Sequence, residues 1–244
     1  MIILDEGTNE FQFPLASIMK GPNDYILKVS DLKVQLQDEI ILENVNFAVK
    51  KGATLAIVGP NGAGKTMLFR TLLNLVPYTG SIQWAEKVKI GYVPQNVSVK
   101  DIPISVKEFL SYKPEADVEG VLTAVRLNET DVIDKTLSVL SGGQLRRVLV
   151  AWALIDDPNV LLFDEPTVGV DIGGEESIFA TLKGLKDKRN ITLLLITHDI
   201  HLVREYTDQL LGLNKCTIFF GDSQQIAEPA LQEKIYGERV CLAE

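Results

Sequence analysis

The chain has 244 residues, of which 46% are hydrophobic and 23% are charged, a balance that suits a globular protein with a sizeable core. Its formal net charge of -9 argues against nucleic acid as a partner, because binding to phosphates needs clustered lysine and arginine. No apolar run approaches the roughly 18–20 residues of a membrane-spanning helix, and the first residues lack the basic start of a signal peptide. We therefore expect that the chain neither spans a membrane nor is exported, and that any membrane role comes through a partner.

The start of the chain is predicted to be irregular and then β-rich. Residues 1–24 contain many turn formers, including Pro14 and Gly21-Pro22, and predict an irregular N-terminal extension. From residue 25 the pattern changes to alternating apolar and polar side chains, which is typical of strands with one buried face. The alternating segments are 25–29, 32–36 and 44–49. An antiparallel β subdomain is therefore expected at the start of a domain that spans residues 25–244.

A short apolar run at Thr54–Val58 has the length and composition of a strand buried on both faces in a parallel sheet. A glycine-rich loop follows it, and then a helical pattern from Thr66 to about Leu75. Two more short strands are expected at Ser81–Trp84 and Val88–Val93.

The middle of the chain, from about residue 96 to 156, is predicted to be an inserted helical subdomain. Ser105 is expected to cap its first helix, because Glu108 stands in the capping-box position three residues later. Beyond this region, Val160–Phe163 and Ile191–Ile196 are strand-like runs separated by a helical span. This order predicts a βαβ unit with parallel strands.

A phosphate-binding loop is predicted between the first buried strand and the helix after it. Its sequence, Gly59-Pro60-Asn61-Gly62-Ala63-Gly64-Lys65-Thr66, fits the pattern G-x-x-x-x-G-K-[ST]. Glycines let the backbone turn tightly, so that several N–H groups and the helix N-terminus point at phosphate oxygens. Lys65 adds a positive charge for the β- and γ-phosphates, and Thr66 offers a hydroxyl to Mg²⁺. We assign these residues and the adjoining Met67 to nucleotide binding.

This loop predicts the fold class. We expect an α/β protein with a P-loop NTPase (RecA-like) core and a mainly parallel sheet, joined to an antiparallel β subdomain and a helical subdomain.

Two carboxylates follow the apolar run Val160–Phe163. A strand buried on both faces delivers Asp164 to its carboxyl end, where ligands gather in such sheets. Asp164 can hold Mg²⁺, and Glu165 is placed to orient or deprotonate an attacking water. A pair of acidic residues before Pro166 is by itself a common start of a loop, so the assignment depends on the phosphate loop.

The segment Leu140-Ser141-Gly142-Gly143-Gln144 supplies a second candidate anion site. Ser141 can cap the helix expected to run to Leu154, and the two glycines expose its first N–H groups. A capped helix after a flexible turn would have the same composition. The segment resembles the signature motif LSGGQ of the ABC ATPase family, and the resemblance covers roughly residues 25–225.

The resemblance implies an ATPase that couples ATP hydrolysis to transport from the cytoplasmic face of the cell membrane. Two copies would form a head-to-tail dimer, with the signature of one facing the phosphate loop of the other and two ATP molecules between them. Ser141 and Gly143, flanked by Gly142 and Gln144, would contact the γ-phosphate bound to the opposite copy. The implied cofactors are ATP and Mg²⁺. The implied partners are a second copy, an integral membrane permease subunit and, indirectly, a substrate-binding protein.

Three further positions match family motifs. Gln95, in Tyr92-Val93-Pro94-Gln95, resembles the glutamine that touches Mg²⁺ and senses the γ-phosphate. His198 resembles the switch histidine that contacts the γ-phosphate and helps to position water. Asp171 resembles the aspartate at the dimer interface. The implied catalytic residues are Lys65, Gln95, Glu165 and His198, and the implied metal ligands are Thr66, Gln95 and Asp164.

The sequence is also similar to the cassettes of zinc and manganese importers. The similarity lies in the segments 90–95, 101–106, 164–171 and 198–203. It implies import of a divalent metal such as zinc or manganese, with the metal handled by the partner proteins.

Two positions depart from the family pattern. Leu36 stands where most cassettes carry an aromatic residue that stacks on adenine, so adenine would pack on an aliphatic surface, or Tyr25 or another residue would substitute. Trp152 stands where an arginine is common.

Three rival functions fit parts of the pattern. A soluble ABC ATPase of DNA repair or chromosome organisation would carry coiled-coil arms, but only about 45 residues separate Gln95 from Leu140, with no heptad run. An ABC ATPase of an assembly or scaffold system, such as the iron–sulfur assembly type, stays open as the alternative. A degenerate regulatory cassette is disfavoured by the intact Lys65, Glu165 and His198.

Overall fold

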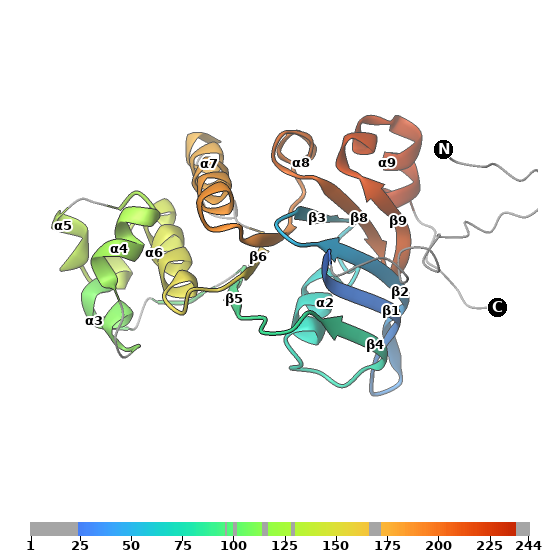
Figure 1. The fold of residues 1–244 in the computed structure, drawn as a ribbon, viewed down its shortest axis with the longest axis horizontal. Coiled ribbons are helices and arrows are strands. Elements are labelled where there is room, and N and C mark those ends of the chain that lie inside the picture. The colour runs from blue at the N-terminus through green and yellow to red at the C-terminus, as the bar shows by residue number, and fades with distance from the viewer. Residues whose placement is uncertain are drawn as a thin grey trace, which may run out of the picture.

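The computed structural model describes residues 24–95, 97–99, 102–113, 117–127, 130–165 and 172–237, with 130–131 and 172–178 described in their backbone only. Within these ranges the chain forms two β-sheets flanked by helices (Figure 1). The predicted N-terminal extension lies almost wholly outside the described residues, and so does Asp171.

The smaller sheet has three antiparallel strands in the order β2-β1-β4. Its strands are β1 (Tyr25–Leu36), β2 (Glu39–Lys50) and β4 (Thr79–Trp84). The segments predicted as two strands, 25–29 and 32–36, are one strand whose register shifts in between. The shift spans Asp31, whose φ of 50° lies in the left-handed region. The predicted antiparallel subdomain is confirmed.

The larger sheet has six strands in the order β5-β6-β7-β3-β8-β9. Its strands are β3 (Thr54–Val58), β5 (Ile90–Val93), β6 (Val160–Asp164), β7 (Thr192–Ile196), β8 (Gln209–Asn214) and β9 (Cys216–Asp222). All neighbours are parallel except β9, which pairs antiparallel with β8 at the edge. The predicted βαβ unit is therefore confirmed, and β8 and β9 are additions that the sequence analysis did not identify.

The central strands are covered on both faces. Along β6, Leu161 and Phe163 belong to the apolar cluster that contains α6 and α7 side chains, whereas Leu162 belongs to the cluster with α2 and the antiparallel sheet. On β7, Leu193 belongs to the cluster with α6 and α7, and Leu194 belongs to the cluster with α2 and the antiparallel sheet. Because successive side chains point to opposite faces, a strand between two layers must be apolar at every position.

The helices are α2 (Lys65–Leu72), α3 (Val106–Ser111), α4 (Val118–Ala124), α5 (Thr130–Ile133), α6 (Gly142–Leu154), α7 (Ile172–Arg189), α8 (Ile200–Tyr206) and α9 (Pro229–Tyr236), with 3-10 turns at Leu137–Val139 and Ser223–Ala227. The helix after the phosphate loop ends before Leu75, whose side chain is exposed. No helix in the described part of the chain is long and apolar enough to cross a membrane.

Helices α3 to α6 form a group at one end of the molecule (Figure 1). The predicted cap of the first of these helices is confirmed, because the Ser105 hydroxyl accepts from the Glu108 N–H and the Glu108 carboxylate accepts from the Ser105 N–H. Trp152 stacks on Phe109 with ring centroids 4.5 Å apart, and Lys113 lies 4.6 Å from the indole centroid. The boundaries of the helical subdomain, 96–156, stay a prediction.

Candidate active site

Four neighbouring strands, β5, β6, β7 and β3, run parallel and end at the same edge of the larger sheet. The phosphate loop follows β3 and begins at Gly59. Gln95 follows β5 after Pro94, Glu165 directly follows β6, and His198 follows β7 after Thr197. Ligands of such sheets bind outside the carboxyl ends of the strands. The sheet topology therefore gathers candidate residues from four distant parts of the sequence.

The phosphate loop ends in a helix whose first N–H groups are left for a ligand. The N-cap of α2 is Gly64, with φ of 89°, no side-chain cap and no acidic residue in the first turn. A Cβ on Gly59 would lie 1.9 Å from the Leu213 carbonyl oxygen, so only glycine fits there. A Cβ on Gly62 would meet nothing within 4 Å, because this side of the loop opens outward. This geometry suits a cradle of amides for an anion.

Lys65 is buried at the floor of this loop. Its ammonium group donates to the carbonyl oxygens of Gly59, at 2.8 Å, and Pro60, at 2.9 Å. Burial lowers the pKa of Lys65, while the carboxylates of Glu165 and Asp164 act in the opposite direction. The amine therefore lies inside the cradle, with its charge directed along the loop.

Asp164 is a buried carboxylate at the end of β6, in a site that also contains the cations Lys65 and Arg146. Its side chain is 1% exposed, and neither carboxylate oxygen has a hydrogen-bond partner of good geometry within the described residues. Burial raises the pKa of Asp164, and the charge of Glu165 adds to the rise, while the nearby Thr66 hydroxyl opposes it. Hard cations such as Mg²⁺ prefer carboxylate and hydroxyl oxygens. These residues therefore fit the metal that the sequence predicts.

Glu165 brings together the predicted catalytic side chains. Its carboxylate accepts a short hydrogen bond from the Gln95 amide, and its other oxygen lies 2.7 Å from Nε2 of His198. The backbone of Glu165 has φ of 46°, in the left-handed region that a non-glycine residue adopts only under constraint. Both carboxylate oxygens are thus engaged, on a backbone conformation set by the surrounding structure.

The signature segment begins α6, as predicted. The Ser141 hydroxyl accepts from the Gln144 N–H at 3.2 Å, and the Gln144 side chain accepts from the Ser141 N–H at 3.1 Å. Figure 1 shows α6 in the helical group and α2 beside the antiparallel sheet, apart from that group. One chain therefore does not bring its two candidate anion sites together.

Among the described residues that line the hollow beside Leu36, none is aromatic. Leu36 ends β1 and borders an open hollow with Ile41 and the intervening turn. Tyr25 begins the same strand, roughly 35 Å away at about 3.3 Å per residue. The suggestion that Tyr25 could substitute is therefore wrong, because an extended strand separates the two positions.

The sequence analysis missed Arg146, whose buried guanidinium donates to carbonyl oxygens at the ends of β5 and β6. A signal was present, since Arg146 precedes the buried Val150 by four positions and so shares the apolar face of the helix.

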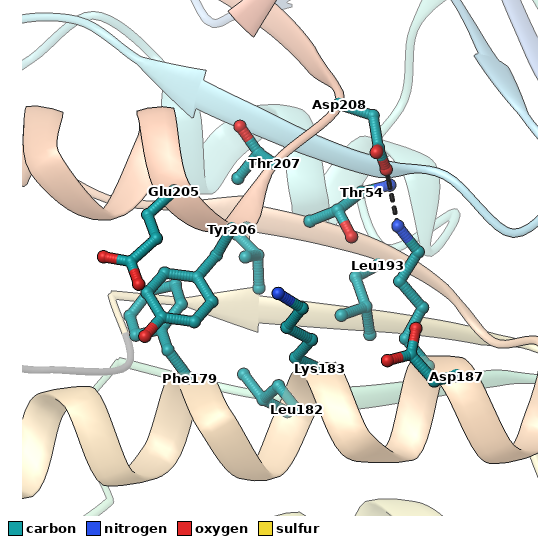
Figure 2. A pocket seen from close by; sticks show the side chains of 12 residues that line it. Thr54, Phe179, Leu182, Lys183, Asp187, Leu193, Glu205, Tyr206, Thr207 and Asp208 are labelled. Atoms are coloured by element: carbon teal, nitrogen blue, oxygen red, sulfur yellow. Dashed lines mark hydrogen bonds and ion pairs between the residues drawn. The ribbon is translucent and has the colours of Figure 1, made fainter.

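A separate cavity of about 150 Å³ lies between α7 and α8, at the end of the larger sheet where β3, β7 and β8 begin (Figure 2). There Asp208 accepts from Lys186, at 2.6 Å, and from the Thr54 N–H, at 2.7 Å. The charged residues that line it are Lys183, Lys186, Asp187, Glu205 and Asp208. This mixture of signs lacks the excess positive charge that a polyphosphate needs, and none of the predicted site residues lines the cavity.

The family described as ABC transporter matches residues 42–168 of the chain. The chain is 34% identical to the zinc import ATP-binding protein ZnuC of Pseudomonas entomophila (strain L48), over 88% of this chain and 85% of that protein. It is 36% identical to ZnuC of Pseudomonas fluorescens, over 85% of this chain and 81% of that protein.

The chain belongs to the ABC transporter family.

Among solved structures, the cassette is similar to cbiO1 of Clostridium perfringens, part of the ABC transporter complex cbiONQ. The TM-score is 0.75 at 28% identity, over 86% of this chain and 93% of that chain. These similarities confirm two predictions: the resemblance to the ABC ATPase family, which was based on residues 140–144, and the P-loop NTPase fold class. The cassette is the ATP-binding and ATP-hydrolysing subunit of an ABC transporter, a family that binds ATP and generally requires Mg²⁺.

The raised pKa of Asp164 predicts that Asp164→Asn stabilises the nucleotide-free cassette. In the unfolded chain the carboxyl ionises near its ordinary pKa of about 3.9, whereas in the folded protein burial raises that pKa. Ionisation therefore destabilises the fold at neutral pH, and an asparagine removes this effect. The melting temperature should rise by about 2–4 °C for each kcal/mol gained, and Mg²⁺-dependent ATP hydrolysis should fall.

The rise in melting temperature caused by Asp164→Asn should shrink as the pH falls through the folded-state pKa of Asp164. The protonated wild-type side chain is then also neutral. Asp134→Asn, at an exposed position, serves as the control and should leave the melting temperature unchanged. A lower melting temperature for Asp164→Asn at neutral pH would contradict the burial argument.

Proposed function

We propose that this cassette powers the import of zinc by a membrane transporter. The proposal is supported by two relatives named as zinc import ATP-binding proteins, each matched over more than four fifths of both chains. In this proposal the cassette lies at the cytoplasmic face of the membrane and docks on a permease subunit. Zinc is carried by the permease and by a substrate-binding protein, and the cassette supplies the conformational work.

The cassette works as a head-to-tail pair. The observation that carries this is that α6, whose N-cap is Ser141, lies in the helical group apart from α2, which begins at Lys65 of the cradle (Figure 1). Each ATP then lies between the cradle of one copy and the signature segment of the other, which comprises Ser141, Gly142, Gly143 and Gln144. Asp171, which lies outside the described residues, is assigned to the interface between the two copies by its family motif alone. Binding of ATP favours the closed pair because both copies contribute groups to one polyphosphate.

Within each site, the amides of the cradle and Lys65 bind the β- and γ-phosphates. Thr66, Asp164 and Gln95 hold Mg²⁺, which when bound neutralises phosphate charge. The buried oxygens of Asp164 support this assignment, because within the described residues neither has a hydrogen-bond partner of good geometry. Leu36 and Ile41 offer adenine an aliphatic surface, which lacks the roughly 1 kcal/mol that stacking on an aromatic ring would add.

Glu165 orients the attacking water and accepts its proton. Gln95 and His198 each occupy one acceptor site on the Glu165 carboxylate, so they compete with the attacking water for its lone pairs. The γ-phosphate is an acceptor for both side chains, so its arrival would draw them off Glu165. This exchange ties activation of the base to the presence of the substrate.

The alternative, an ATPase of an assembly or scaffold system, would share the same site chemistry. The named relatives favour transport. Purification from membranes would separate the two, since a transport cassette brings a polytopic membrane protein with it and an assembly ATPase brings soluble scaffold proteins.

Deletion of the gene in its host, with growth measured in zinc-depleted medium, tests the proposed substrate. The deletion strain should grow poorly, and zinc or the wild-type gene should restore growth. Lys65→Ala, which removes the charge from the cradle, should not restore it. Growth that responds to manganese and not to zinc, or that ignores both metals, would contradict zinc import.

Glu165→Gln should retain ATP binding and lose hydrolysis by about 10²–10⁴-fold, because the amide cannot accept the proton of the attacking water. ATP should therefore trap a pair of copies, seen by light scattering as a mass about twice the 27.0 kDa of the chain. Glu233→Gln, on the exposed face of α9, is the matched control. A Glu165→Gln variant that hydrolyses ATP like wild type would remove Glu165 from this role.

A further inference from the structure

Arg146 is the one arginine among the buried charged residues of the described ranges. It is the fifth residue of α6, four positions after Gly142, and its side chain is 5% exposed. Burial lowers the pKa of its guanidinium, while Asp164, Glu165 and Tyr92 act in the opposite direction. A buried cation destabilises a fold unless its hydrogen bonds are satisfied. The acceptors of Arg146 therefore identify the segments that it connects.

Four of those partners are backbone carbonyls at the edge of the active site. One terminal nitrogen donates to Pro94, at 2.6 Å, and more weakly to Gln95, at 3.5 Å. The other donates to Asp164, at 3.1 Å, and by a shorter bond to Glu165. The guanidinium thus joins the ends of β5 and β6, two carbonyls from each.

Two of these carbonyls, those of Gln95 and Glu165, belong to residues whose side chains meet at the catalytic carboxylate. Gln95 donates to Glu165, and each of these residues also has its backbone oxygen bonded to Arg146. Glu165 has the left-handed φ of 46°, a conformation that is unfavourable for a non-glycine residue and persists when neighbours enforce it. Its N–H is fixed by the Ile196 carbonyl at 3.0 Å, and its own carbonyl is fixed by Arg146.

We propose that Arg146 is a positioning residue for ATP hydrolysis. It sets the spacing between Gln95 and Glu165, and it holds the turn that orients the Glu165 carboxylate. Because Arg146 lies on α6, it also connects Gln95 and Glu165 to the helix that carries the signature segment. A planar guanidinium can bridge two segments with two nitrogens at once, whereas a lysine ammonium is a compact charge that cannot span them. The inference rests on the proposed role of Glu165 and extends it to a residue outside the known motifs.

Arg146→Lys tests the proposal in the full-length chain. It keeps the charge and the aliphatic stem but loses the two-segment bridge, so kcat for ATP hydrolysis should fall by about 10–100-fold through misplacement of Glu165. The dissociation constant for a non-hydrolysable ATP analogue should change by less than about threefold, because the cradle is untouched. Arg147→Lys is the matched control, since Arg147 donates to the Val125 carbonyl at 2.9 Å, away from the site.

A double variant separates positioning from general damage. If Arg146 acts through Glu165, then adding Arg146→Lys to Glu165→Gln should lower the residual rate by less than about threefold. A full, additive loss in the double variant, unchanged kcat in Arg146→Lys, or nucleotide binding lost in step with kcat would each overturn the proposal. Arg146→Gln, which retains one donor group, provides a second variant with the same expected pattern.

Wild type and Glu165→Gln are measured in the same series. If wild type hydrolyses ATP and Glu165→Gln does not, the role of Glu165 stands, and a failure of the Arg146 variants to behave as expected counts against the positioning role alone.

Discussion

Parallel hydrogen bonding among β5, β6, β7 and β3 is the constraint on which the active site depends. It brings four loops to one edge of the sheet, so that the amide cradle, Gln95, Glu165 and His198 meet although they are far apart in sequence. The strands can hold this position because their side chains are buried on both faces between two apolar layers. The sheet thus determines where each of these loops begins.

That edge contains groups that are unfavourable without a ligand. Asp164 is buried with no partner of good geometry in the described residues, and Glu165 is held in a left-handed backbone conformation. Burial also lowers the pKa of Lys65 and of Arg146. A nucleotide with its metal would supply opposite charges to Lys65 and Asp164, so binding can relieve strain that the packed sheet maintains.

The sequence predicted best what depends on local patterns. The fully apolar run Thr54–Val58 gave the bounds of β3 correctly, because only a doubly covered strand is apolar at each position. Ser141 was identified as a cap because a serine directly before a helical pattern is a local signal, and the structure adds a reciprocal bond to the Gln144 side chain. The continuity of β1 was missed because a local register shift looks like a break, and its extended form rules out Tyr25 as a substitute for Leu36. The contacts of Arg146 could not be predicted, because backbone carbonyls leave no mark in a sequence.

The central claim is that each ATP is bound between the Gly59–Thr66 cradle of one copy and the Ser141 end of α6 of another. A crystal structure of the cassette with Mg²⁺ and a non-hydrolysable ATP analogue tests it most directly. The account predicts two nucleotides in a pair of copies, each with its phosphates on the cradle amides and its γ-phosphate within hydrogen-bond distance of the partner's signature segment. A nucleotide on the cradle with the signature segments of both copies turned away from every γ-phosphate would contradict it.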